Sequence, residues 1–248
     1  MLKPTKRWAL ILIAVLILGI TGCGTVKDNA KKATLDKVIV NTQSKTQKLP
    51  NFTINLKIPV IDGMSNTAQQ KEINQIISQD QIKRIKPMKE ELANYVQFAK
   101  ENDYPVNPFD LVSDYKVSYN KNDLLSVTAT IYQYTGGAHG TTEQVSYNVD
   151  LQTGQLLTLK DLFKTNTNYI NPINQEIEKQ IAAKPEEFFT EDNMGFKTIQ
   201  AKQPFYLTDG GIVVYFQLYE IAPYAAGIKE FKIPVALINT QLNKRFVP

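Results

Sequence analysis

The chain has 248 residues, of which 43% are apolar and 21% are charged, and this balance excludes a wholly disordered chain and a polytopic membrane protein. It contains one cysteine and one histidine, so neither an internal disulfide nor a zinc site with several Cys and His ligands can form. We therefore predict no metal site and no cofactor. The formal charge is +4, and it is unevenly distributed along the chain.

Residues 1–22 have the pattern of an export signal. Three positive charges within residues 1–7 precede an unbroken run of 13 apolar or glycine residues at 8–20, which is shorter than the roughly 20 residues of a membrane-spanning helix. The run ends in Ile20-Thr21-Gly22-Cys23, which resembles the lipobox of bacterial lipoproteins. We predict cleavage before Cys23 and lipidation of its thiol, which would anchor an extracytoplasmic protein to the cell membrane. The alternative is a retained single membrane span.

The basic excess lies outside the predicted folded part. Residues 23–48 carry six Lys against two Asp and are predicted to form a flexible tether, with one possible strand at Lys37–Thr42. Residues 49–248 carry 19 basic against 22 acidic side chains, a net charge of −3. A nucleic-acid-binding protein needs a basic patch on its folded part, so no nucleic-acid partner is expected.

The first half of the folded part, residues 49–150, begins with a strand and a helical segment. Apolar and polar residues alternate over Phe52–Val60, which predicts a half-buried strand. Isoleucines then recur at three- and four-residue steps within Ser65–Lys100, which predicts helix, with Ser65 as its N-cap. Pro87 should break or kink that helix because it removes a backbone donor and clashes with the preceding turn.

Three antiparallel strands should complete this first unit, at Leu111–Tyr119, Leu124–Tyr134 and Glu143–Val149. Residues 150–155 supply a turn after the last of them.

The second half, residues 151–248, repeats the same kinds of element. Its predicted elements are a helical turn at Leu159–Phe163, a helix at Asn171–Ala183, a hairpin of Phe205–Leu207 with Gly211–Tyr219, a strand at Lys229–Ile233 and a short helix at 234–239. Helices segregated from antiparallel hairpins indicate an α+β fold of two units that pack together.

A glycine-rich loop is the strongest candidate for a binding site. The segment Tyr132–Gly140 has three glycines within five positions, so its backbone needs positive φ or a close approach. We interpret it as a binding loop with an imidazole near its tip, and its candidate residues are Tyr134, Gly136, Gly137, His139 and Gly140. The alternative is a tight loop in which His139 satisfies buried carbonyls. An acid–base pair of His139 with a carboxylate also stays open.

A second candidate loop follows the predicted strand Gly211–Tyr219. The segment runs from Tyr219 to Gly227. Its Pro223 and Tyr224 lead into small residues that end at Gly227, a sequence suited to presenting an aromatic ring. The alternative is plain loop packing.

No catalytic residue is predicted. The chain has no glycine-rich phosphate loop, no serine nucleophile elbow and no metalloprotease helix motif. Any two of the 22 acidic side chains of residues 49–248 could still converge, which leaves a glycan-processing enzyme with a carboxylate pair as the alternative function.

Several of these motifs together resemble one family. They are Tyr132–Gly140, Tyr147–Leu151 with Thr153-Gly154, Leu159–Phe163, and the ending from Phe205 to Pro234. They resemble a bacterial family of extracellular domains of unknown function, which occurs in the lysozyme-binding half of the anti-sigma-V factor RsiV and as the N-terminal module of the peptidoglycan deacetylase PdaC. The resemblance covers roughly residues 50–240 and implies an α+β fold like that of the RsiV ectodomain, with loops that enter a partner's cleft.

Two departures from these relatives shape the functional expectation. Only seven residues precede the apolar run, so we expect no sigma-binding segment. One histidine cannot supply the Asp and two His of a polysaccharide deacetylase site. The resemblance therefore implies a non-catalytic, lipid-anchored module that binds a lysozyme-like wall protein or peptidoglycan itself. A structural partner of another envelope complex is a further option.

Overall fold

The computed structural model describes residues 37–190 and 194–246, all within one compact unit of residues 34–248. The predicted signal, Cys23 and most of the predicted tether lie outside the described residues. No helix within the described ranges is long and apolar enough to cross a membrane.

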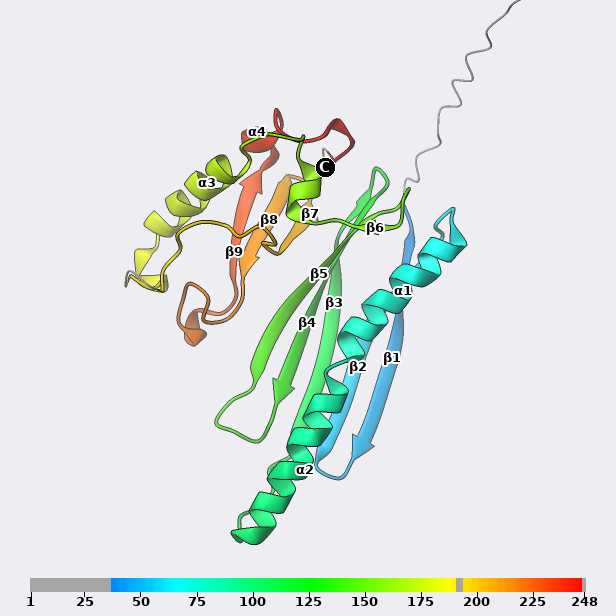
Figure 1. Cartoon of the computed structure of the whole chain (residues 1–248), viewed down its shortest axis with the longest axis vertical. Coiled ribbons are helices and arrows are strands. Elements are labelled where there is room, and N and C mark those ends of the chain that lie inside the picture. The colour runs from blue at the N-terminus through cyan, green and yellow to red at the C-terminus, as the bar shows by residue number, and fades with distance from the viewer. Residues whose placement is uncertain (1–36, 191–193, 247–248) are drawn as a thin grey trace, which may run out of the picture. The chain divides into compact units, whose positions relative to one another are not determined.

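The larger of two sheets has six strands in sequence order (Figure 1). Its strands are β1 (Ile39–Leu49), β2 (Phe52–Asp62), β3 (Phe109–Lys121), β4 (Leu124–Tyr134), β5 (Thr141–Asp150) and β6 (Gln155–Leu156). Neighbours are antiparallel except β2 and β3, which run parallel. A parallel pair needs a long crossover, and here that crossover contains α1 (Thr67–Ile82) and α2 (Ile85–Glu101). The predicted antiparallel trio is β3, β4 and β5.

The helical segment begins and breaks at positions other than those predicted. The N-cap is Asn66 rather than Ser65, because the Asn66 side chain accepts hydrogen bonds from the first turn of α1. The break falls between Ile82 and Ile85, three residues or more before Pro87. Pro87 is the third residue of α2, where a backbone N–H would have no intrahelical partner.

Strand β1 corrects the predicted tether. Residues 39–48 were expected to be mostly flexible, yet β1 pairs with β2 along its whole length. Val38, just before it, is buried, and its backbone exchanges two hydrogen bonds with the Asn120 side chain, at 3.1 and 2.8 Å. Ordered structure therefore starts about ten residues earlier than predicted. Most side chains of β1 are exposed, so the strand lacks the alternating pattern that reveals β2.

The second sheet has three antiparallel strands, β7 (Phe205–Thr208), β8 (Gly211–Phe216) and β9 (Lys229–Pro234). The remaining helices are α3 (Ile170–Ala182), α4 (Val235–Ile238) and the 3-10 turns η1 (Leu159–Leu162), η2 (Pro185–Glu187), η3 (Tyr224–Ala226) and η4 (Lys244–Phe246). The α+β class is confirmed. The prediction for β8 was too long, because a turn begins at Gln217, whose N–H donates to the Glu220 carboxylate.

Each sheet has its own apolar core. The inward side chains of β2, such as Ile54 and Leu56, pack with Ile73 and Ile77 of α1. Around the small sheet, Ile173 of α3 belongs to a second cluster with side chains of β7, β8 and β9. The apolar residues that alternate along β2, and those that recur every three or four residues along the helices, thus lie mainly on the faces buried in these cores.

Two buried polar side chains join the sheets. Ser126 of β4 donates to the side chain of Asn148 of β5 at 2.6 Å, on the sheet face opposite α1. The Asn148 amide donates to the Phe205 carbonyl at 2.8 Å, and the Ser126 hydroxyl accepts from the Leu207 N–H at 3.1 Å. The edge of β7 that does not pair with β8 is thereby hydrogen-bonded to the face of the large sheet.

Replacing Asn148 with leucine should destabilise the protein by about 2–3 kcal/mol. The change removes the donor to the buried Phe205 carbonyl and the acceptor of the buried Ser126 hydroxyl. The matched control is Asn55→Leu on exposed β2 surface. Urea unfolding measures both. Equal stabilities of the two variants would contradict this account of the joint.

Candidate functional site

The two candidate loops meet. The rings of His139 and Tyr224 stack with centroids 4.3 Å apart and planes at 30°. The Tyr224 hydroxyl donates to the Gly140 carbonyl at 2.8 Å. The loop between β4 and β5 and the segment around η3 therefore form one surface, although 84 residues separate the hydrogen-bonded pair.

The β4–β5 loop is held by further hydrogen bonds. Asn107 donates to the Gly136 carbonyl at 2.8 Å, and the Tyr134 hydroxyl donates to the Gly137 carbonyl at 2.9 Å. Gly136 has φ +82°, a conformation that side chains disfavour. Tyr134, Gly136 and Gly137 thus shape the loop, and the exposed ring of His139 lies next to them in sequence.

Gly140 is required by close approach. A Cβ at this position would lie 2.4 Å from the Tyr132 ring and 2.5 Å from the Gln133 carbonyl oxygen. The glycine lets the Tyr132 ring lie over the backbone at the start of β5.

His139 uses a backbone partner. Its Nδ1 lies 2.9 Å from the Gly140 carbonyl oxygen, to which it donates. Glu143, four residues further on, is paired instead with Arg84, at 2.5 Å. Nδ1 therefore satisfies a carbonyl, as the alternative interpretation held, while the ring stacks on Tyr224 and the residue stays exposed.

Tyr219 extends this surface; it begins the second candidate segment but was not among the predicted site residues. Its ring centroid lies 5.6 Å from that of Tyr224, and its side chain is 56% exposed. The strand pattern suggested that Tyr219 continued β8, but its φ of 67° places it in the turn. We call Tyr132, His139, Tyr219 and Tyr224 the aromatic cluster. Pro223 is the exposed N-cap of η3 and precedes Tyr224 directly.

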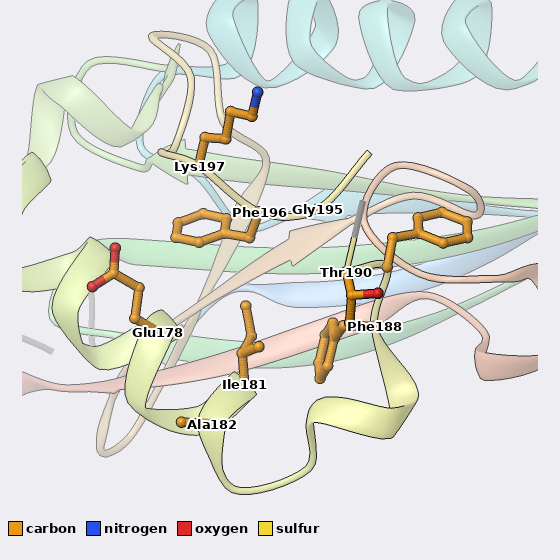
Figure 2. A pocket seen from close by; sticks show the side chains of 9 residues that line it. Glu178, Ile181, Ala182, Phe188, Thr190, Gly195, Phe196 and Lys197 are labelled. Carbon is orange, nitrogen blue, oxygen red and sulfur yellow. The ribbon is translucent and has the colours of Figure 1, made fainter. Parts of the chain in front are cut away.

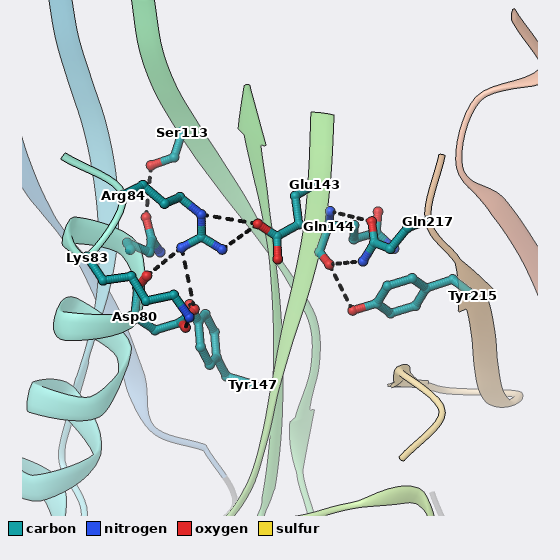
Figure 3. A network of polar contacts seen from close by, with 10 residues as sticks. Asp80, Lys83, Arg84, Ser113, Glu143, Gln144, Tyr147, Tyr215 and Gln217 are labelled. Carbon is teal, nitrogen blue, oxygen red and sulfur yellow. Dashed lines mark hydrogen bonds and ion pairs between the residues drawn. The ribbon is translucent and has the colours of Figure 1, made fainter. Parts of the chain in front are cut away.

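Strand β5 is held at one face and at its free edge just after the loop (Figure 3). On one face Glu143 accepts from Arg84, which is only 8% exposed. At the free edge of the strand, the backbone of Gln144 exchanges two hydrogen bonds with the Gln217 side chain, at 3.1 and 2.7 Å. The Tyr215 hydroxyl also donates to the Gln144 carbonyl, at 3.2 Å. These contacts fix the two loops relative to each other.

The protonation states of this network suit a structural role. Burial raises the pKa of Tyr215 to about 12, so its hydroxyl remains a donor at neutral pH. Burial would raise the pKa of Asp80, but hydrogen bonds from Lys83 and Tyr147 hold it below its ordinary value. Asp80 therefore stays ionised beside Arg84.

A pocket of about 440 Å³ lies elsewhere, between α3 and the segment after η2 (Figure 2). The rings of Phe188 and Phe196 face it together with Ile181, and Glu178 and Lys197 add opposite charges. Its lining shares no residue with the aromatic cluster. No group of three or more His, Cys, Asp or Glu side chains within residues 37–190 and 194–246 is arranged to hold a metal ion.

Replacing Gly140 with alanine should distort the loop and lower the midpoint of thermal unfolding by several degrees, because backbone as well as a ring crowds the added Cβ. Gly137→Ala is the matched control, since an added Cβ there meets nothing within 4 Å. Differential scanning calorimetry compares the two variants. An unchanged melting temperature for Gly140→Ala would show that the loop yields freely.

Comparison with known families finds two matches, which are separated by residues 143–159. Residues 45–142 match the family model described as Deacetylase PdaC, and residues 160–236 match a protein family of unknown function, DUF3298. The β4–β5 loop falls in the first match and Tyr224 in the second. The aromatic cluster is therefore built from both.

Two proteins of Bacillus subtilis strain 168 are similar in sequence. The anti-sigma-V factor RsiV is 31% identical over 220 residues, which cover 85% of this chain and 73% of RsiV. The peptidoglycan-N-acetylmuramic acid deacetylase PdaC is 22% identical over 264 residues, which cover the whole of this chain and 53% of PdaC. The chain thus spans about half the length of PdaC.

Two crystal structures share the fold. A DUF3298 protein from Bacteroides fragilis superposes with a TM-score of 0.65 at 20% identity, covering 86% of this chain and 96% of that one. A DUF3298 protein from Pseudomonas aeruginosa gives 0.57 at 16% identity, covering 87% and 97%.

Proposed function

The chain belongs to the family that RsiV and PdaC share, and from this premise we propose that it is a lipid-anchored, non-catalytic module that binds a protein partner outside the cytoplasm. The partner class we favour is a lysozyme-like, wall-associated protein.

The observation that carries the proposal is the aromatic cluster. Tyrosine is enriched at the energetic centres of protein interfaces, because one side chain combines a large apolar face with a polar tip. Here Tyr219 and His139 are exposed, and the Tyr224 hydrogen bond to Gly140 fixes the geometry between two loops. A surface ordered before binding loses less conformational entropy on association.

The position of the cluster supports an outward-facing site. The described chain starts beside Asn120, at one end of the large sheet, and β1 runs from there to Leu49. The pairing of β2 with β3, and of β3 with β4, places Tyr134 and the loop after it at the Leu49 end. Eleven strand residues span about 35 Å. A lipid on Cys23 would thus leave the cluster at the end of the sheet opposite the tether.

Charge is compatible with the favoured partner. Residues 49–248 carry a net charge of −3, and a basic partner would be attracted to them. Peptidoglycan is the competing ligand, and the experiment below separates the two.

Replacing Tyr219 and Tyr224 together with alanine should weaken partner binding at least tenfold, the loss expected for a pair of central aromatic anchors. Leu237→Ala, an exposed apolar residue of α4, is the control and should bind normally. The full chain in detergent is titrated with lysozyme by calorimetry and sedimented in parallel with purified peptidoglycan. If the protein sediments with peptidoglycan while the lysozyme titration gives no heat of binding, the ligand is a glycan and not a protein. Release of new glycan fragments would refute the non-catalytic assignment.

Replacing Cys23 with serine should move the protein from the membrane fraction to the soluble extracytoplasmic fraction, because the thiol is the proposed lipid attachment point. Mass spectrometry of the wild-type protein from native membranes should find a diacylated N-terminal cysteine. An unacylated chain that begins at Met1 would refute the anchor.

A further inference from the structure

We propose that the C-terminal end of α2 carries a second aromatic anchor, Phe98 with Tyr104, for the same partner that the aromatic cluster binds. This inference rests on the proposed function and extends its surface.

The pair is unusually exposed for two large rings. Phe98 is 53% exposed and Tyr104 is 61% exposed, yet the rings stack on each other with centroids 6.1 Å apart. Contiguous exposed aromatic surface on a folded protein is characteristic of an interaction site.

The end of the helix holds this pair in a defined geometry. The Tyr104 N–H donates to the Ala99 carbonyl at 2.9 Å, and both the backbone and the side chain of Asn102 donate to the Phe98 carbonyl. Asp103 turns the chain with φ 56°. This is a Schellman-type helix end, in which an apolar contact joins the two flanking residues. Small aliphatic residues would satisfy that contact, so the motif does not itself explain two rings that are more than half exposed.

The anchor is tied to the β4–β5 loop. Tyr95 of α2 stacks on Phe109 at 6.0 Å and donates to the Pro105 carbonyl. Asn107, in the same connecting segment, donates to the Gly136 carbonyl. Figure 1 shows α2 running past the end of the sheet at which this loop lies. The two aromatic surfaces therefore occupy the same end of the large sheet and are connected by ordered contacts.

The aromatic cluster alone is too small to bury the area that a stable protein complex needs. A stable protein complex buries about 800 Å² on each partner, whereas a fully buried aromatic side chain contributes about 150–250 Å². Tyr224 and Tyr132 are already partly covered within the protein. The α2 end supplies further apolar area. The exposed carboxylates of Glu101 and Asp103 outnumber the one exposed cation beside them, Lys100, and so suit a basic partner.

Site-specific photo-crosslinking in intact cells tests this inference without assuming the partner's identity. The full chain carries the photoreactive residue in place of Glu101, Ala138 or Leu237, all exposed. We expect the same adduct protein from positions 101 and 138, identified by mass spectrometry, and none from position 237. An adduct from 138 alone, a different protein at 101, or the same protein at 237 overturns the second anchor. The absence of adducts at both 101 and 138 overturns the proposed function as well.

A double substitution adds an energetic test. Phe98→Ser with Tyr104→Ser, combined with the photoreactive residue at 138, should lower the adduct yield at least tenfold. Ile76→Ser, at an exposed apolar site of α1, is the control and should leave the yield unchanged. Circular dichroism checks that both variants keep their helices. An unchanged yield from the folded double variant overturns the anchor and leaves the aromatic cluster as the sole binding surface.

Discussion

The pair formed by Ser126 and Asn148 is the constraint on which the site depends. A strand edge buried without partners is costly, and these two side chains satisfy the free edge of β7 from the face of the large sheet. Because β8 and β9 pair in turn beside β7, the joint sets where the segment between them lies. Tyr224 belongs to that segment, so its hydrogen bond to Gly140 depends on contacts made by β7, the edge strand of the small sheet.

A site assembled in this way differs from a loop presented by a single domain. The aromatic cluster takes Tyr132 and His139 from the region that matches PdaC, and Tyr219 and Tyr224 from the region that matches DUF3298. Neither region alone contains the stacked pair. The clamp on Gln144 by Tyr215 and Gln217 adds a second fixed point between them. What is specific to this surface is therefore the relative placement of side chains from the two regions, and not the chemistry of any one residue.

Sequence reasoning found what depends on local pattern. Alternation revealed β2, the turn residues 208–210 revealed the β7–β8 hairpin, and glycine spacing revealed the β4–β5 loop. It missed most of β1, because a strand exposed on both faces has no period-two signal. It also extended the strand β8 to Tyr219, although that strand ends at Phe216. The contact of His139 with Tyr224 could not be predicted, since each loop has its own local signal and only the tertiary joint brings them together.

The direction of β1 has a mechanical consequence. The chain enters this strand at Val38, and the β4–β5 loop lies at the far end of the sheet. Under the proposed function, tension between the lipid anchor and a bound partner would therefore run along the strand. The backbone hydrogen bonds of an antiparallel pair lie perpendicular to that direction. The eleven residue pairs of β1 and β2 would share such a load in shear rather than open one after another.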